Sequence, residues 1–389
     1  MTSVVLKRRC NFFVGVKMKI LVFIAILLGC IHLTQGGCQT HCYFRASRTG
    51  TVSFQPDNID PSLCEYLIIG YSTIALYGNP RLEIRQQIYK FIQRIPLYKG
   101  RNANFKILLE VTDMYDFLIT EFFEYLTSDS LINKFATNAK QFLLEKGFDG
   151  LSIRLAENFG STDYRFTFSS FVNIMSSNFQ NGAKRLLLYV SLSGTQYLFT
   201  DELDFDFGGV GRAVDKLVLE TEFFRPPART HGHPSRLYGD PGKTNISVNF
   251  VINLAISRGC PKEKLIFTVS PLSRCFQKTS THPDAQYLYV YSSRFSEFCQ
   301  FLAKGIQVQR LSDGGPYVTG RVLENHPMPF TGDFIYYYED DVSLKAKVDY
   351  VKQKGLGGIM LWDFWNDDIM GTCRRGPYPI LRAVRSECR

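Results

Sequence analysis

The chain has 389 residues, of which 45% are hydrophobic and 14% aromatic, and its formal charge is +9. This content is typical of a protein with a large packed core. The charge is moderate and no basic run is dense enough to follow a phosphate backbone, so we expect no nucleic-acid partner.

Residues 1–36 have the pattern of a secretory signal. Basic residues precede an apolar run at 20–28, and the small residues Gly36 and Gly37 follow it. The run is shorter than the roughly 20 residues that a membrane helix needs. Cleavage after Gly36 leaves 353 residues and, because the five basic residues of the leader depart, a charge of +4. We therefore expect an extracellular, secreted protein without membrane insertion in its mature form; the sequence does not distinguish Met1 from Met18 as the start.

Eight cysteines remain after the leader, and they are Cys38, Cys42, Cys64, Cys260, Cys275, Cys299, Cys373 and Cys388. An even number in a secreted chain favours disulfides over thiol chemistry. Metal binding is disfavoured because no C-x-x-C pair occurs.

Eight short apolar segments are predicted as strands: 42–44, 66–71, 105–111, 148–155, 185–192, 214–221, 264–269 and 358–364. Helical periodicity separates several of them, as in 131–146. Strands that alternate with helices indicate parallel βαβ units, and eight such strands indicate a closed α/β barrel. The stretch 273–332 breaks the alternation and is rich in Ser, Gly, Pro and Tyr.

The segment Lys146–Asn158 reads K-G-F-D-G-L-S-I-R-L-A-E-N. It resembles the signature strand of the family 18 glycoside hydrolases, the chitinases, whose pattern is F-D-G-x-D-x-D-x-E. Asp149 keeps the first aspartate of that pattern. Ser152 and Arg154 stand in place of the second and third aspartates, and Ala156 stands in place of the catalytic glutamate.

The resemblance extends over the whole mature chain. The opening C-Y-F at 42–44, N-I-D-P-S-L-C at 58–64 and G-L-G-G-I-M-L-W at 355–362 also match the family. It implies a (β/α)8 TIM barrel with a small α+β insertion domain between strand seven and helix seven. The expected boundaries are 37–272 for barrel strands one to seven, 273–332 for the insertion domain and 333–389 for the completion of the barrel.

The same resemblance predicts that hydrolysis is lost. In the family, a glutamate protonates the leaving oxygen while the acetamide of the sugar attacks, oriented by the neighbouring aspartate. Ala156 has no proton to give, and a one-residue step along a strand turns Glu157 out of the lumen. The tyrosine after strand six is Glu222, the one near the end of strand seven is Leu272, and the G-G-W after strand three is replaced at 112–114.

Candidate ligand-binding residues are Trp362, Tyr71, Arg154 and Glu222. Trp362 occupies the family's position at the floor of the central sugar subsite, although a barrel-core aromatic residue is an equally good interpretation. Ser47 and Met114 replace two other tryptophans of the family.

The preferred hypothesis is a secreted non-hydrolytic chitinase-like protein that binds chitin oligosaccharides or other N-acetylglucosamine-containing glycans weakly, with no cofactor. The alternative is a growth-factor-like or immune-modulating ligand that contacts a protein receptor and has a vestigial cleft. An enzyme with a rebuilt acidic pocket is a third hypothesis.

Disulfide pairing follows partly from the resemblance, which implies Cys42–Cys64 and Cys299–Cys373. Cys38–Cys388 is predicted because a closed barrel brings the termini together, and Cys260–Cys275 because the two flank strand seven. Asn245 begins an N-glycosylation sequon. His231 and His233 align with a family loop that binds no metal, so we predict no metal site.

Alternation along the strands predicts a charge pair in the lumen. Arg154 shares the inward face of strand four with Ser152, and the family comparison also places Glu220 and Glu222 inward. An arginine buried alone would cost several kcal/mol, so it needs a carboxylate. We predict that Arg154 pairs with Glu222 or Glu220, with Glu110 as a third member. The alternative is that Arg154 extends to solvent at the barrel mouth.

Overall fold

The computed structural model describes residues 37–46, 55–75, 79–112, 128–155, 163–194, 205–224, 229–239, 246–279, 286–322 and 332–389. The predicted signal at 1–36 lies outside these ranges, as do Ser47, Met114, Ala156, Glu157 and Asn245. The elements given below belong to one unit, Cys38–Arg389. Among the described residues, no helix is both long and apolar enough to cross a bilayer.

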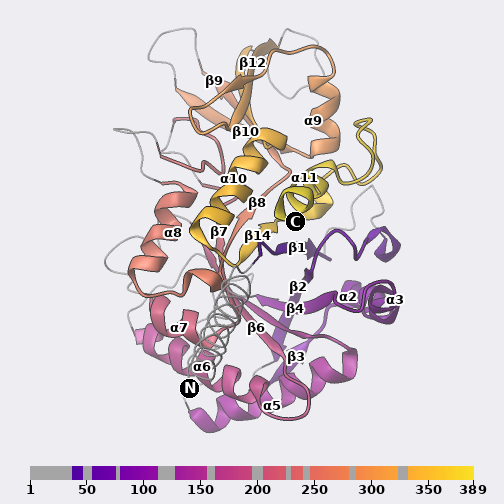
Figure 1. The fold of residues 1–389 in the computed structure, drawn as a ribbon, viewed down its shortest axis with the longest axis vertical. Coiled ribbons are helices and arrows are strands. Elements are labelled where there is room, and N and C mark those ends of the chain that lie inside the picture. Colours follow the sequence, from indigo (N-terminus) through magenta and orange to yellow (C-terminus); the bar gives the residue numbers. More distant parts are fainter. Residues whose placement is uncertain are drawn as a thin grey trace, which may run out of the picture. The chain divides into compact units, whose positions relative to one another are not determined.

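Eight parallel strands form a closed barrel (Figure 1). They are β1 (Thr40–Arg45), β2 (Tyr66–Ala75), β4 (Lys106–Thr112), β5 (Gly150–Leu155), β6 (Leu187–Ser193), β7 (Lys216–Glu220), β8 (Leu265–Val269) and β14 (Gly358–Leu361). Each strand pairs with the next, and β1 pairs with both β2 and β14, which closes the ring. A short strand, β3 (Arg81–Glu83), adds an antiparallel hairpin to β2. The predicted barrel is confirmed, and each predicted segment overlaps one of its strands.

Strand side chains alternate between two cores. On β4, Ile107 and Leu109 pack into the large outer core, whereas Leu108 packs into a smaller cluster inside the barrel. That inner cluster consists of Tyr43, Ile68, Leu108, Tyr189, Val218, Ile266, Met360 and Trp362. Because successive side chains of a strand point to opposite faces, one set fills the lumen and the other set packs under the helices.

The helices of the barrel are α2 (Gln86–Ile92), α3 (Ile95–Arg101), α5 (Asp129–Lys146), α6 (Asp163–Gln180), α7 (Phe207–Ala213), α8 (Val248–Ser257), α10 (Asp341–Lys354) and α11 (Pro379–Cys388). Three short 3-10 helices join them: η1 (Pro56–Asn58), η3 (Lys262–Lys264) and η4 (Phe364–Asn366). The Ser128 side chain caps α5, and Gly147 ends it at φ 81°. The buried side chains Ile132, Phe135, Ala139 and Leu143 share one face of α5, so the helix packs that face on the barrel.

The insertion domain is a five-stranded antiparallel sheet with the helix α9 (Phe295–Leu302), at the top of Figure 1. Its strands are β9 (Ser273–Lys278), β10 (Tyr287–Ser293), β11 (Gln309–Arg310), β12 (Pro316–Val322) and β13 (Gly332–Tyr337). They lie in the order β10-β9-β13-β12-β11. Because β13 pairs with β9 and β12, this sheet continues past the expected boundary at 332 and ends at Tyr337.

Three of the four predicted disulfides are present: Cys38–Cys388, Cys42–Cys64 and Cys299–Cys373. The prediction of Cys260–Cys275 is wrong, because both are buried free thiols. Cys260 precedes β8 and Cys275 follows it, so the five residues of that strand separate them. At about 3.3 Å per residue, they are farther apart than the roughly 7 Å that a disulfide can span.

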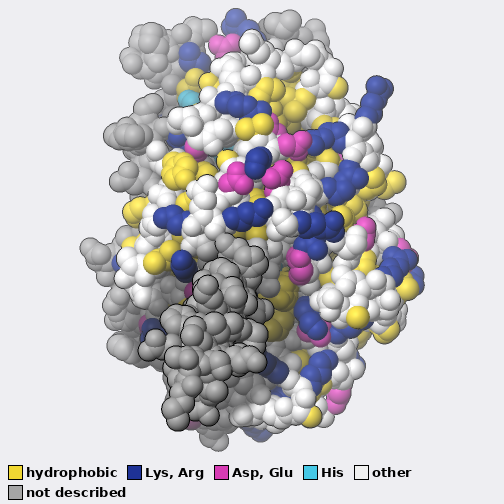
Figure 2. Space-filling view, viewed as in Figure 1, with side chains coloured by type: hydrophobic (Ala, Val, Ile, Leu, Met, Phe, Trp, Pro, Cys, Tyr) yellow, Lys and Arg dark blue, Asp and Glu magenta, His cyan; other side chains and the backbone are white. Residues whose placement is uncertain are grey.

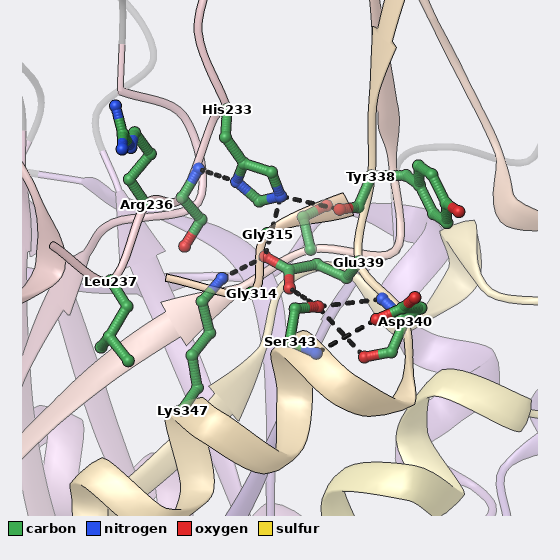
Figure 3. Close-up of polar contacts among 12 residues, drawn as sticks. His233, Arg236, Leu237, Gly314, Gly315, Tyr338, Glu339, Asp340, Ser343 and Lys347 are labelled. Carbon is green, nitrogen blue, oxygen red and sulfur yellow. Dashed lines mark hydrogen bonds and ion pairs between the residues drawn. The ribbon is translucent and has the colours of Figure 1, made fainter. Parts of the chain in front are cut away.

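A buried polar network joins the loop after β7 to the insertion domain and α10 (Figure 3). His233 Nδ1 accepts a hydrogen bond from the Ser235 amide, so its proton lies on Nε2, which donates to the Tyr338 carbonyl at 2.7 Å. Burial lowers the pKa of His233, which keeps the ring neutral. The neighbouring His231 lies 2.7 Å from the Tyr337 hydroxyl.

The same network contains an ion pair between Glu339 and Lys347, whose side chains are each only 3% exposed. The second carboxylate oxygen of Glu339 accepts a hydrogen bond from Ser343 at 2.7 Å. This pair ties the middle of α10 to the segment that directly follows β13.

Charge is dispersed on the face of the molecule that Figure 2 shows. On the face shown in Figure 2, Lys and Arg side chains are distributed among acidic and uncharged ones rather than gathered into one continuous track. Among the described residues, no group of three or more His, Cys, Asp or Glu side chains is placed to hold a metal ion.

Candidate functional site

Charged and aromatic side chains meet where the barrel strands end. Tyr43 comes from β1, Glu110 from β4, Arg154 from β5 and Glu220 from β7, while Trp362 directly follows β14. The carboxyl ends of barrel strands are the positions from which this fold builds its functional sites. We call these five residues the lumen cluster.

The centre of the lumen cluster is a bidentate ion pair. Arg154 Nε lies 2.6 Å from Glu220 Oε1, and Arg154 Nη2 lies 2.7 Å from Glu220 Oε2. Two parallel charge-assisted hydrogen bonds fix the guanidinium in one orientation. Glu220 is one of the two partners predicted for Arg154. The Arg154 side chain is 24% exposed and that of Glu220 only 6%, so the pair lies just inside the barrel mouth.

Both faces of Trp362 are covered. The Tyr43 ring stacks on it with centroids 3.6 Å apart and planes inclined by 6°. The Arg154 guanidinium carbon lies over the ring at 4.7 Å from its centroid. Since Tyr43 occupies one face at stacking distance, the guanidinium must cover the other. Trp362 is consequently 4% exposed.

Glu110 is the third member of the predicted charge cluster. Its Oε1 accepts a hydrogen bond from the Tyr43 hydroxyl at 2.7 Å, and its Oε2 is buried without a hydrogen-bond partner among the described residues. Burial raises the pKa of Glu110 to about 7, partly offset by the positive charge of Arg154. This carboxyl therefore changes its charge near neutral pH.

Glu222 does not pair with Arg154. Its Oε2 accepts a hydrogen bond from the Thr268 hydroxyl of β8. Burial, and then the nearby charge of Glu220, raise the pKa of Glu222 to about 7. The site thus combines one ion pair with two buried carboxyls whose pKa values lie close to neutrality.

Gly70 makes room for Tyr43 and Glu110. A Cβ atom at this position would lie 2.7 Å from Tyr43 Cζ and 3.0 Å from Glu110 Oε1, closer than side-chain atoms tolerate. We expect Gly70→Ala to destabilise the fold by about 1–3 kcal/mol, since the stacked rings cannot retreat without strain. Urea denaturation measures the loss. Gly100→Ala is the control because no atom lies within 4 Å of its Cβ position; equal stabilities of the two variants would contradict the prediction.

Asp149 lies away from the lumen cluster, although it keeps the first aspartate of the signature. It precedes β5, where its Oδ2 accepts the Ile107 amide at 2.9 Å and pairs with Lys99 at 2.8 Å. It therefore ties β4, β5 and α3 together at the amino end of the barrel. Ser152 is buried on β5 between Glu110 and Tyr189 in register.

Tyr71 was also predicted as a ligand-binding residue, but its described contacts are with Arg85. The Arg85 guanidinium donates to the Tyr71 hydroxyl at 2.9 Å and lies 4.2 Å from its ring centroid. Tyr43, which the sequence indicated only as part of a strand, is the aromatic residue that supports Trp362. Its position in the matching C-Y-F segment was the available signal.

The closed (β/α)8 barrel with an α+β insertion after its seventh strand is the fold that this chain shares with solved structures of a chitinase-like protein. The chain belongs to the glycosyl hydrolases family 18, whose model matches residues 39–367.

Related proteins include both chitinases and chitinase-like proteins. Chitotriosidase-1 of Mus musculus is 26% identical over 367 residues, covering 87% of this chain and 75% of the relative. Chitinase-3-like protein 2 of Homo sapiens is 27% identical over 389 residues, covering 91% and 94%. A solved structure of human YKL-39, described as a pseudo-chitinase with retained chitooligosaccharide binding properties, has a TM-score of 0.76 at 25% identity, covering 90% and 99%.

Proposed function

We propose that this chain is a secreted, non-hydrolytic chitinase-like protein that binds amino-sugar glycans weakly at the carboxyl end of its barrel. The Arg154–Glu220 pair carries the proposal. By comparison with the family pattern, Arg154 occupies the position of the aspartate that orients the acetamide of the sugar. A guanidinium cannot accept the acetamide hydrogen bond, because arginine has donors only.

We expect no chitinase activity. Position 156 is alanine, so the proton donor of the family mechanism is missing, and Arg154 removes the orienting carboxylate. The release of fluorophore from chitobioside and chitotrioside substrates is the measurement. Turnover that disappears in Glu157→Gln would show that the neighbouring carboxylate acts as the acid and would overturn the proposal.

Ala156→Glu should also remain inactive, because it restores the acid without restoring the aspartate. In addition, the ion pair fills the space that the sugar needs. Turnover by this single variant would contradict the role given to Arg154.

Weak glycan binding is supported by two observations. Trp362 is retained at the position that the resemblance assigns to the floor of the central sugar subsite, and the related YKL-39 is described as retaining chitooligosaccharide binding. Weakness is expected because a sugar can stack on Trp362 only after Arg154 leaves its face. Retention on chitin beads tests the proposal, with Trp362→Ala as the variant that should lose retention and the exposed Leu288→Ala as control.

A second candidate function is a protein ligand whose cleft is vestigial. It is favoured by the burial of Trp362, which leaves no free aromatic face among the lumen cluster. In that case neither the native protein nor Trp362→Ala is retained on chitin. Cross-linking to proteins of a cell surface would then identify the partner.

A further inference from the structure

Carboxylates outnumber cations at the mouth of the barrel. Glu110, Glu220 and Glu222 are 0%, 7% and 3% exposed. Arg154 is the guanidinium that contacts one of them, while Arg45, at the end of β1, acts on Glu110 through charge alone. A buried carboxylate needs either a cation or a proton. The site is therefore short of positive charge.

Among the described residues, one of these carboxyls has a buried oxygen that accepts no hydrogen bond, and another has no ion-pair partner. Glu110 Oε2 is buried and accepts no hydrogen bond from any described residue. Glu222 accepts one hydrogen bond, from Thr268, and no described cation lies within ion-pair distance of it. An additional donor carrying positive charge would satisfy the free oxygen of Glu110.

Arg154 indicates which chemistry the site accepts. Its guanidinium is a cation that lies over the Trp362 ring and donates two hydrogen bonds to Glu220. A sugar ring with an ammonium group offers the same two features, a C–H face for the aromatic ring and a cation for the carboxylate. Because the Arg154 side chain is 24% exposed at the mouth, its long stem is able to swing toward solvent.

We propose that the lumen cluster selects amino sugars with free amines, that is glucosamine units, over N-acetylated units. The sugar ring replaces Arg154 on Trp362, and its ammonium pairs with Glu220 and Glu110. This inference rests on the proposed glycan-binding function and names the ligand class of that site. An N-acetyl group is neutral, so it cannot supply the missing charge.

Binding of a cation at this site should change the number of protons that the protein holds. Glu110 is faced by Tyr43 and Arg45 from β1, by Arg154 from β5 and by Glu220 from β7. Glu222 is faced by Glu220, Arg154 and the Thr268 hydroxyl. An ammonium paired with Glu110 lowers the pKa of that carboxyl from about 7. Below neutral pH, where the sugar amine already carries its proton before it binds, the complex therefore releases a proton on forming.

The test compares glucosamine tetramer with N-acetylglucosamine tetramer by calorimetry at about pH 6, where the glucosamine amines are protonated before binding. Buffers of different ionisation enthalpy reveal the protons that are released. We expect the free-amine tetramer to bind the native protein at least about tenfold more tightly, with net proton release. Glu220→Gln and Glu110→Gln should bring this preference close to one. Glu110→Gln keeps the Arg154–Glu220 pair and so remains informative if Glu220→Gln fails to fold. Glu145→Gln, exposed on α5, is the matched control.

Equal or tighter binding of the acetylated tetramer would overturn the inference and leave weak glycan binding standing. A free-amine preference that persists in both variants would also overturn it, because recognition would then lie outside the lumen cluster. If neither tetramer binds, the inference and the proposed glycan binding both fail.

Discussion

Lys347→Met is expected to destabilise the protein by about 3–5 kcal/mol, because it leaves the Glu339 carboxylate buried without its cation. The methionine side chain matches the stem of lysine in length, so packing is nearly preserved and the loss is electrostatic. Ser343 still donates one hydrogen bond to Glu339, but one neutral donor does not replace an ammonium. Urea unfolding of the disulfide-intact protein, followed by tryptophan fluorescence, measures the change.

The matched control is Lys345→Met on the same helix. Lys345 pairs with Asp349 and Glu387, but its side chain is 55% exposed. Exposed pairs contribute little, so this variant should change stability by less than about 1 kcal/mol. Lys347→Met with Glu339→Gln should recover most of the loss, because the buried charge is gone. A loss for Lys347→Met no larger than that of the control would refute the argument.

The strands and their facing directions were accessible from sequence. Apolar runs located all eight barrel strands. The period of two grouped the side chains of each strand by face, and the family pattern identified the face of Arg154 and of Glu220 as the inward one. The same rule could not choose between Glu220 and Glu222. Glu220 is the last residue of β7, and beyond the strand end alternation no longer fixes the direction of a side chain.

Other features of the site depended on which distant segments of the chain the closed barrel brings together. Tyr43 stacks on Trp362 because β1 is hydrogen-bonded to β14, and these strands are more than 300 residues apart in the chain. Asp149 matched a catalytic motif in identity but lies before β5, at the opposite end of the strand from Arg154. Cys260 and Cys275 looked close in sequence, yet an extended strand separates them.

The contribution of Glu110 to the stability of the fold should be lost as pH rises from about 4.5 through 7. The pKa of Glu110 is raised from 4.5 to about 7 in the fold, mainly by burial. The folded state therefore holds this proton more tightly than the unfolded state does. Since stability falls with pH wherever the folded state binds more protons, the contribution is fully present below 4.5 and is lost as pH rises through 7. Glu222, whose pKa is raised to about 7, acts in the same direction.

Glu110→Gln isolates this contribution from the other groups that titrate over the same range. Asp367, whose pKa is raised to about 6, and Lys216, whose pKa is lowered to about 8, remain in both proteins. So do the buried His41 and His233, whose pKa values are lowered by burial, and the effects of all four groups cancel in the difference. The amide oxygen of glutamine can still accept the Tyr43 hydroxyl, and it carries no charge that burial would penalise. Relative to the native protein, the variant should gain about 3 kcal/mol of stability between acidic pH and pH above 7, which is the free energy equivalent to raising this pKa from 4.5 to about 7. Glu145→Gln on the exposed face of α5 should show no such pH-dependent difference. The measurement is the denaturant midpoint of each protein across this pH range. A stability difference between Glu110→Gln and the native protein that stays constant with pH would contradict the prediction, because it would mean that Glu110 ionises at its ordinary pKa in the fold.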